Sequence, residues 1–332
     1  MSKTAIFGVG AIGGYLAAQM LDQNLETLLF ARPERAAKLR ANGISTTEEI
    51  HISGNDLDVT SDANNLSEVD RVLLAVKATS LEAVIPVLRE SIPQSTPVFC
   101  LANGVRPVRN LKAALPDHNI LAGMVPFNVV ERENGILHRS SSGEVVVQQG
   151  DPGRELQKLM AGTLSPIILA SNMDAVQYGK LLLNLNNPVN ALSGLPLKSQ
   201  LSNWHFRRVY ALAFKEALRV YKIAKVQHMQ AAALPAERIA RVLMWPDFLF
   251  KLLALPRQDL DPEANTSMAQ DLSAGRKTEI EDLNGEIVRI AQEVQTSAPI
   301  NTKLVKLIHQ AEAGERRNWS GPDLLEAVQR HD

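Results

Sequence analysis

The first residues of the chain place the strongest constraint on its fold. An apolar run, TAIF, leads directly into GVGAIGG, in which Gly8, Gly10 and Gly13 have the spacing of a dinucleotide-binding loop. Each glycine removes a side chain that a tight turn, a pyrophosphate or helix packing would meet, and the phosphates would lie at a helix N-terminus. A simple strand-to-helix turn is the alternative interpretation. The loop residues expected to bind the cofactor are Gly8, Gly10, Ala11, Ile12 and Gly13.

The rest of the chain has two patterns. Short apolar runs alternate with helical runs as far as about residue 171, which predicts a parallel sheet with helices on both faces. Within this part, two β-like runs around SSSG in 135–149 predict an antiparallel hairpin at the edge of the sheet. The fold class expected is therefore α/β, with an N-terminal Rossmann-type doubly wound sheet in residues 1–172 and an all-α C-terminal domain in residues 173–332. Helices of the second domain are expected at 174–187, 205–229, 235–254, 263–274, 278–295 and 300–314.

Composition excludes several classes of function. The formal net charge is −1, so nothing suggests a nucleic-acid partner, and the longest apolar runs are too short to span a membrane. The single cysteine, Cys100, lies in an apolar strand and is expected to be a core thiol. The seven histidines lack metal-ligand spacing, so we expect no metal site. With no signal peptide recognised and no disulfide possible, a cytoplasmic location is expected.

The end of the second strand indicates which dinucleotide is bound. An NAD site places a carboxylate there, about 20 residues after the glycines, to bind the ribose hydroxyls. This chain instead has Phe30-Ala31-Arg32. A guanidinium binds a 2′-phosphate well, so the sequence favours NADP(H), with Arg32 on the phosphate. A solvated surface arginine is the alternative interpretation.

Two further strand ends carry polar side chains. Lys77 follows one strand in AVKAT, and Asn103 follows another in LANGV. Ligands of open α/β sheets bind at the carboxyl ends of the strands. The Asn103 amide is placed to hydrogen-bond the nicotinamide ribose or the substrate, although Asn-Gly turn chemistry alone also explains it.

The stretch GKLLLNLNNPVN places polar residues in a leucine-rich helix. Lys180, Asn184 and Asn187 are spaced to share one face, and Pro188 is expected to break the helix. An ammonium on that face can stabilise the negative charge that develops on a ketone oxygen during reduction, and can donate the proton. The alternative interpretation is a solvated face whose asparagines cap the helix end.

A second polar cluster lies in residues 265–287. Ser267 with Gln270, and Thr278 with Glu281, have the capping-box spacing of two successive helices. The first helix N-terminus can receive a substrate carboxylate, with Ser267 adding a hydroxyl, and Glu279 can hydrogen-bond a substrate hydroxyl. The alternative is that Ser267 only caps its helix and Glu279 only complements a helix dipole.

Together these motifs resemble the ketopantoate reductases (2-dehydropantoate 2-reductases). GVGAIGGYLA, the VKA and ANG strand ends, GKLLLN and SMAQDLSAGRKTEIEDLNG occur in the order of that family along nearly the whole chain. The resemblance implies NADPH-dependent reduction of 2-dehydropantoate to pantoate, on the route to pantothenate and coenzyme A. It implies a proton donor at Lys180 and a second residue of the catalytic site at Glu279, which contacts the substrate or cofactor. It also implies cofactor contacts at Arg32 and Lys77 and further substrate or cofactor contacts at Asn103, Asn184 and Ser267.

Two departures from the family pattern leave the substrate open. The second asparagine of the family stands eight residues after the lysine, where this chain has Pro188, so Asn187 and Asn190 compete for its role. The segment 244–262 is unusually bulky and apolar, and its part 244–256 is a candidate homodimer interface. Two other functions therefore remain: an NADP-dependent reductase of another 2-keto or 3-hydroxy acid, and a non-catalytic NADP(H) sensor. A sensor would not need the polar set that a reductase needs, which is retained here as Lys180, Asn184, Ser267 and Glu279.

Overall fold

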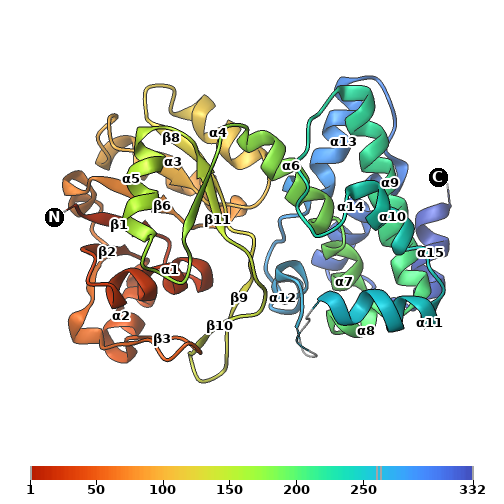
Figure 1. The fold of residues 1–332 in the computed structure, drawn as a ribbon, viewed down its shortest axis with the longest axis horizontal. Coiled ribbons are helices and arrows are strands. Elements are labelled where there is room, and N and C mark those ends of the chain that lie inside the picture. The colour runs from red at the N-terminus through yellow and green to blue at the C-terminus, as the bar shows by residue number, and fades with distance from the viewer. Residues whose placement is uncertain (1, 259–260, 262–263, 331–332) are drawn as a thin grey trace. The chain divides into compact units, whose positions relative to one another are not determined.

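The structure is a computed structural model that describes residues 2–258, 261 and 264–330 (Figure 1). The chain divides into two compact units, Met1–Met173 and Asp174–Asp332. The first unit is α/β, and the described part of the second unit is helical. The predicted fold class, a doubly wound Rossmann-type sheet followed by a helical region, is confirmed.

An eight-stranded sheet forms the centre of the first unit, in the order β12-β11-β8-β7-β6-β1-β2-β5. The strands from β8 to β5 all pair in parallel, and β1 lies between β6 and β2. From β1, the chain adds β2 and β5 on one side of the sheet and then β6, β7 and β8 on the other side. The boundary between β1 and β6 is therefore a topological switch point. The strands are β1 (Thr4–Phe7), β2 (Thr27–Phe30), β5 (Asp58–Thr60), β6 (Arg71–Leu74), β7 (Val98–Cys100), β8 (Ile120–Met124), β11 (Val145–Gln148) and β12 (Ile167–Ala170).

Helices cover this sheet because successive strand residues point to opposite faces. Ile6, Leu29 and Phe99 share one core with buried residues of α1, α2 and α5. The adjacent strand residues, such as Ala5 and Val98, point to the opposite face of the sheet and are also fully buried. Helices α3 and α4 contact each other and form a second helical layer. These helices are α1 (Ala11–Asp22), α2 (Pro33–Asn42), α3 (Leu81–Ser91), α4 (Arg106–Ala114) and α5 (Asp151–Met160).

The hairpin predicted within 135–149 is wrong. Strand β10 (Leu137–Arg139) pairs antiparallel with the preceding strand, β9 (Val129–Glu131), in a separate two-stranded sheet. Strand β11 instead pairs antiparallel with β8 and parallel with β12. The turn between β9 and β10 contains Asn134-Gly135, and Gly135 has φ +78°. Asn-Gly is the stronger hairpin signal, because this turn requires positive φ. A further small sheet joins β3 (Ile44–Ser45) and β4 (His51–Ile52), which the sequence analysis did not foresee.

Two of the long helices predicted for the second unit are interrupted. The prediction for 235–254 breaks at Pro246, which lacks the backbone donor that a continuous helix needs, and the prediction for 278–295 breaks at Leu283. The first residue of the predicted helix 263–274, and part of the segment 244–262, lie outside the described residues. The helices are α6 (Met173–Asn184), α7 (Asn187–Ser193), α8 (Leu197–Leu201), α9 (Trp204–Ala224), α10 (Ala236–Val242), α11 (Asp247–Leu249), α12 (Ser267–Ser273), α13 (Asn284–Glu293), α14 (Pro299–Glu312) and α15 (Gly321–Gln329).

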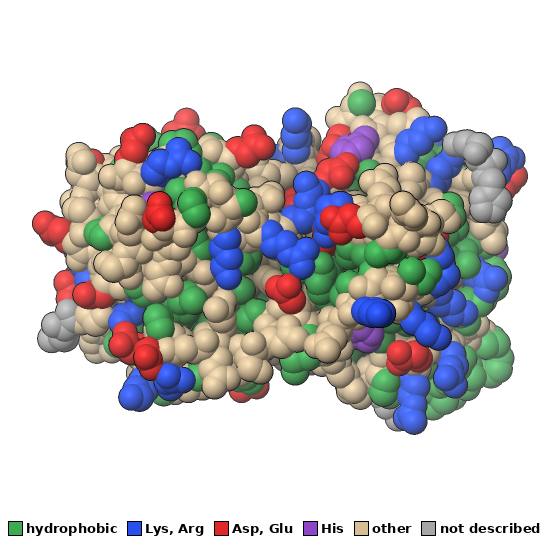
Figure 2. All heavy atoms as spheres, turned by 90° about the horizontal axis from the view of Figure 1, so that it is seen from above, with side chains coloured by type: hydrophobic (Ala, Val, Ile, Leu, Met, Phe, Trp, Pro, Cys, Tyr) green, Lys and Arg blue, Asp and Glu red, His purple; other side chains and the backbone are tan. Residues whose placement is uncertain are grey.

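Charged side chains of both signs lie near one another over much of the face shown in Figure 2, as a net charge of −1 would suggest. Within the described residues, helices lack the combination of length and apolarity that crossing a bilayer requires.

Gly13 allows α1 to pack closely against the backbone at the end of β1. A Cβ atom at Gly13 would lie 2.1 Å from the Gly8 carbonyl oxygen, whereas one at Gly10 would meet nothing within 4 Å. We therefore expect Gly13→Ala to lower the free energy of unfolding by about 1–3 kcal/mol, the usual cost of overpacking. The control Gly10→Ala should change it by less than about 0.5 kcal/mol in urea denaturation. Equal losses in the two variants would contradict this account.

Candidate active site

Four predicted cofactor positions lie at the carboxyl ends of neighbouring parallel strands. The glycine loop follows β1, Arg32 follows β2, Lys77 follows β6 and Asn103 follows β7. These four strands are adjacent in the order β7-β6-β1-β2. The sheet therefore gathers residues that are up to 95 positions apart in the sequence (Gly8 to Asn103) at its switch point.

The glycine loop has the geometry of a dinucleotide cradle. Gly8 has φ +97°, and a Cβ there would lie 2.6 Å from Val76 Cγ1, so the tight turn requires glycine. Gly10 precedes α1 and leaves open space on its outer side. With close helix packing at Gly13, these features fit a pyrophosphate bound at the N-terminus of the twelve-residue α1.

Arg32 lies exposed at the N-terminal end of α2, and Lys77 is exposed just before a short 3₁₀ turn (Ala78–Ser80). Asn103 is half-buried, and the next residue, Gly104, has φ +90°. The turn after β7 thus uses its glycine in the way that Asn-Gly turn chemistry demands, which is compatible with a ligand role for the amide beside it.

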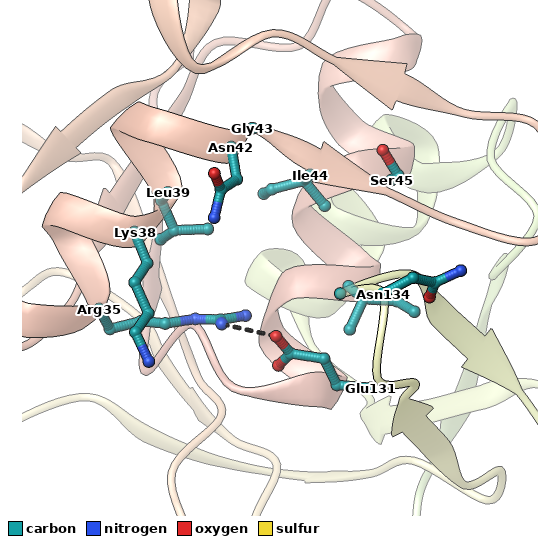
Figure 3. Close-up of a pocket in the computed structure, with 11 residues that line it drawn as sticks. Arg35, Lys38, Leu39, Asn42, Gly43, Ile44, Ser45, Glu131 and Asn134 are labelled. Atoms are coloured by element: carbon teal, nitrogen blue, oxygen red, sulfur yellow. Dashed lines mark hydrogen bonds and ion pairs between the residues drawn. The ribbon is translucent and has the colours of Figure 1, made fainter.

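Arg35 supports the glycine loop, a role that the sequence analysis missed. Its Nε donates to the Val9 carbonyl oxygen at 2.9 Å, and its guanidinium pairs with Glu131 Oε1 at 2.9 Å. The pair borders a pocket of about 140 Å³ formed by α2, β3 and the β9–β10 hairpin (Figure 3). No sequence signal indicated this role, because the two partners of Arg35 are distant in the chain: Val9 lies in the glycine loop and Glu131 in β9.

In the second unit, Lys180 and Glu279 act on one another electrostatically. Lys180 is half-buried on α6, and Glu279 is 7% exposed in the turn that precedes the 3₁₀ segment Ile280–Asp282. Burial lowers the pKa of the Lys180 ammonium to about 8, while the negative charge of Glu279 acts to raise it. An electrostatic interaction therefore links two residues that the sequence separates by 99 positions (279 − 180).

Helix α6 is held closely by the loop that follows α9. Met229 N donates to the Ala175 carbonyl oxygen at 2.8 Å. A Cβ at Gly179 would lie 2.2 Å from the Met229 carbonyl oxygen, so glycine is needed for this approach. Tyr178 Oη also donates to the buried Glu286 at 3.0 Å. The two residues before Lys180 are therefore fixed by packing and hydrogen bonding.

The four asparagines of this region have different environments. Helix α6 ends at Asn184 and α7 begins at Asn187, with Pro188 in its first turn, so the predicted break at Pro188 is confirmed. Asn184 and Asn187 are half-buried. Asn186 is buried in a reciprocal amide pair with Gln200, with distances of 3.0 and 3.3 Å. Asn190 is 0% exposed and bonds to protein groups on both sides of its amide.

The capping boxes predicted at Ser267 and Thr278 are wrong in detail. The Thr278 hydroxyl accepts from Ile280 N at 3.3 Å in the turn before the 3₁₀ segment, and α13 begins only at Asn284. Thr266, not Ser267, is the N-cap of α12, and its hydroxyl accepts from Ala269 N at 3.3 Å. Ser267 is then the first helical residue and is half-buried. Thr266 and Ser267 are adjacent hydroxyl residues, so spacing alone could not tell which one caps the helix.

A chain of polar contacts flanks Glu279. Thr278 N donates to Glu312 Oε1 at 2.7 Å, and His309 lies between Glu312 Oε2, at 3.1 Å, and Glu281 Oε1, at 2.8 Å. The hydrogen bond to Glu281 raises the pKa of His309, with a further contribution from Glu312. These contacts fix the backbone on both sides of Glu279.

Cys100 is 0% exposed on β7, and burial raises the pKa of its thiol to about 12, which confirms the predicted core thiol. Among the described residues, the His, Cys, Asp and Glu side chains form no cluster of three or more arranged to hold a metal ion.

A glycine loop at the switch point of a doubly wound sheet, followed by a helical unit, is an arrangement that dinucleotide-dependent enzymes of the Rossmann type have. Residues 4–152 match the family model described as ketopantoate reductase PanE/ApbA, and residues 172–312 match the model of its C-terminal region. The chain belongs to the ketopantoate reductase PanE/ApbA family. It is accordingly an oxidoreductase of the class that acts on CH–OH groups.

Relatives match over almost their whole length. The chain is 25% identical to 2-dehydropantoate 2-reductase of Listeria innocua serovar 6a, over 95% of this chain and 98% of that protein. It is 27% identical to the enzyme of that name from Mycobacterium tuberculosis H37Rv, over 93% and 98% respectively.

Solved structures share the fold. A PanE/ApbA family ketopantoate reductase from Ralstonia eutropha JMP134 is 25% identical, with a TM-score of 0.79 over 94% of this chain and 99% of that one. A D-mandelate dehydrogenase solved with NADH and anilino(oxo)acetate has a TM-score of 0.78 over the same shares at 22% identity. The latter similarity shows the fold alone.

The contacts of His309 predict a dependence of stability on pH. Because its pKa is raised in the folded state, protonated His309 stabilises the fold fully below its ordinary value of 6.5, and this contribution is lost as pH rises through the raised pKa. We expect urea denaturation of the wild type to show this loss, and His309→Gln to lack it. The difference should not exceed about 1 kcal/mol, because the side chain is 46% exposed. The exposed His51, which contacts Ser45 Oγ, provides the control His51→Gln; a matching change there would contradict the assignment.

Proposed function

We propose that this chain is an NADPH-dependent reductase of 2-dehydropantoate, with Lys180 as the proton donor. The observation that carries the proposal is the buried Lys180 ammonium, whose charged form is favoured by the negative charge of Glu279. The names of its relatives, 2-dehydropantoate 2-reductases, support this substrate. The product, pantoate, would place the enzyme on the route to pantothenate and coenzyme A.

The two units would have separate tasks in this reaction. Residues 1–172 would hold the cofactor, with the glycine loop on the pyrophosphate, Arg32 on the 2′-phosphate of the adenosine ribose and Lys77 as a further cofactor contact. The bound nicotinamide would supply the hydride. Residues 173–332 would hold the keto acid, with Asn184, Asn187 and Ser267 orienting it and Glu279 bonding its hydroxyl. Asn103 would contact the nicotinamide ribose or the substrate.

Lys180 would act on the carbonyl oxygen of the substrate. As negative charge develops on that oxygen, the ammonium stabilises it and then transfers a proton to it. Glu279 favours the protonated form of the lysine, because its charge raises the pKa that burial has lowered. A site with these two groups therefore keeps an acid ready near neutral pH.

We also propose a homodimer. Phe248 and Leu252 are 72% and 70% exposed, which is unusual for large apolar side chains. A structural relative from Staphylococcus aureus, 18% identical, is described as a dimeric ketopantoate reductase.

A panel of 2-keto acids assayed for NADPH oxidation tests the proposed substrate. 2-Dehydropantoate should give the highest kcat/KM in the panel, which should also include a branched aliphatic and an aromatic 2-keto acid. Another acid that exceeds it by orders of magnitude would support the alternative reductase. No turnover of any acid by the NADPH-bound protein would support the non-catalytic sensor.

Lys180→Ala should lower kcat by about two to four orders of magnitude, the range for loss of a general acid or charge stabiliser. In the wild type, kcat/KM for reduction should fall as pH rises through about 8, because the neutral lysine has no proton to donate. NADPH affinity should hold nearly constant, and the exposed Lys222 on α9 provides the control Lys222→Ala. If Lys180→Ala keeps more than about a tenth of kcat, the lysine is structural.

Arg32→Ala should raise the KM for NADPH much more than it lowers kcat, since the phosphate contact is the same in the ground and transition states. The KM for NADH should change little, because NADH has no 2′-phosphate. Lys38→Ala, which removes another exposed cation of α2, is the control. Equal KM values for the two cofactors in the wild type would refute NADPH preference.

Glu279→Gln should weaken substrate binding less than Glu279→Ala, because the amide keeps an acceptor oxygen. Both variants remove the charge that raises the pKa of Lys180, so the fall of kcat/KM at high pH should move to lower pH. NADPH affinity should not change. Unaltered substrate kinetics and an unaltered pH profile in both variants would leave Glu279 with a structural role only.

A further inference from the structure

The side chain of Asn190 connects two helices of the second unit. Its Oδ1 accepts from Thr266 N and from Thr266 Oγ1, both at 3.0 Å, and its Nδ2 donates to the Leu195 carbonyl oxygen at 2.8 Å. The residue is 0% exposed. An asparagine amide has two acceptor and two donor positions, so three of the four are used by the protein itself.

The partner of Asn190 is the residue that starts α12. Thr266 Oγ1 donates to Asn190 and also accepts from Ala269 N at 3.3 Å, which completes the N-cap of this helix. The next residue is Ser267. On the other helix, Asn187 lies one turn before Asn190 in α7. One amide therefore fixes the two helix ends that carry Asn187 and Ser267.

The far end of α12 is also held. Arg317 Nη1 donates to the Leu272 carbonyl oxygen at 2.9 Å, and Arg276 Nε donates to the buried Asp271 Oδ1 at 2.8 Å. A seven-residue helix has little stability of its own. Its position is therefore set by these contacts at its two ends.

We propose that Asn190 is a positioning residue, which sets the place of Ser267 relative to Asn187 and does not itself contact the substrate. This rests on the proposed function, in which those two residues orient the keto acid. It also decides between the two asparagines that compete for that role, in favour of Asn187. A shift of about 1 Å in a substrate-positioning group can cost up to about 100-fold in rate, so loss of the amide should be visible in kinetics.

Asn190→Ala is the main test, and Asn186→Ala is its matched control. Asn186 is another buried asparagine of the same segment, but its amide pairs with Gln200 instead of with α12. Amide hydrogen exchange should become at least about tenfold faster in residues 266–273 of Asn190→Ala and not of Asn186→Ala. The kcat/KM for the keto acid should fall at least about tenfold in Asn190→Ala and less than about twofold in the control, with the Kd for NADPH unchanged in both.

Substitutions of Thr266 test the same contact from its other side. Thr266→Ser keeps the hydroxyl and should retain wild-type kinetics and exchange. Thr266→Val removes the hydroxyl but not the backbone donor, so it should reproduce part of the Asn190→Ala effect. Valine and threonine have nearly the same size, which keeps the comparison of Thr266→Val with the wild type valid if Asn190→Ala folds poorly.

Three outcomes would overturn the proposal: equal kinetic losses in Asn190→Ala and Asn186→Ala, unchanged exchange in residues 266–273 of Asn190→Ala, or faster exchange there with unchanged kinetics. Failure of the proposed function would look different. Either Lys180→Ala would keep more than about a tenth of kcat or no keto acid would be turned over, while the exchange experiment would still report whether Asn190 holds α12.

Discussion

The candidate site of the second unit depends on one electrostatic interaction, in which the charge of Glu279 raises the pKa that burial lowers at Lys180. Removing an ammonium from water is costly, and the pKa of about 8 records that cost after the carboxylate has offset part of it. Such a pair is maintained only if the backbones that carry both residues are fixed. Gly179 against Met229 fixes one side, and Glu312 with His309 fixes the other.

The first unit depends on a different constraint, the close approach of backbone to backbone at the glycine loop. Gly13 allows α1 to pack on the end of β1, and Gly8 allows the chain to turn at positive φ. Arg35 then secures the Val9 carbonyl from outside the loop. In the first unit, missing side chains create the space for a ligand, whereas in the second unit charged and amide side chains contribute the polar groups.

Local sequence signals predicted those features whose causes are local. The glycine spacing, the alternation of strands and helices, and the break at Pro188 all depend on residues within a few positions of one another, and all three agree with the structure. Adjacent candidates caused the errors. SSSG competed with Asn134-Gly135 for the hairpin, and Ser267 competed with Thr266 for the cap, so the pattern was present but its register was not determined.

The sequence by itself determined the fold class, the family and the positions of the motifs, because periodicity, glycine spacing and motif order are properties of the chain alone. Only the tertiary structure decided which polar residues meet. Asn186 and Asn190 are the same residue type four positions apart, yet one pairs with Gln200 and the other holds Thr266. Likewise, nothing near Glu279 in sequence indicates that Lys180 shares its electrostatic environment. The physical reason is that a buried polar group is satisfied by whichever partner the packing of distant helices brings within reach.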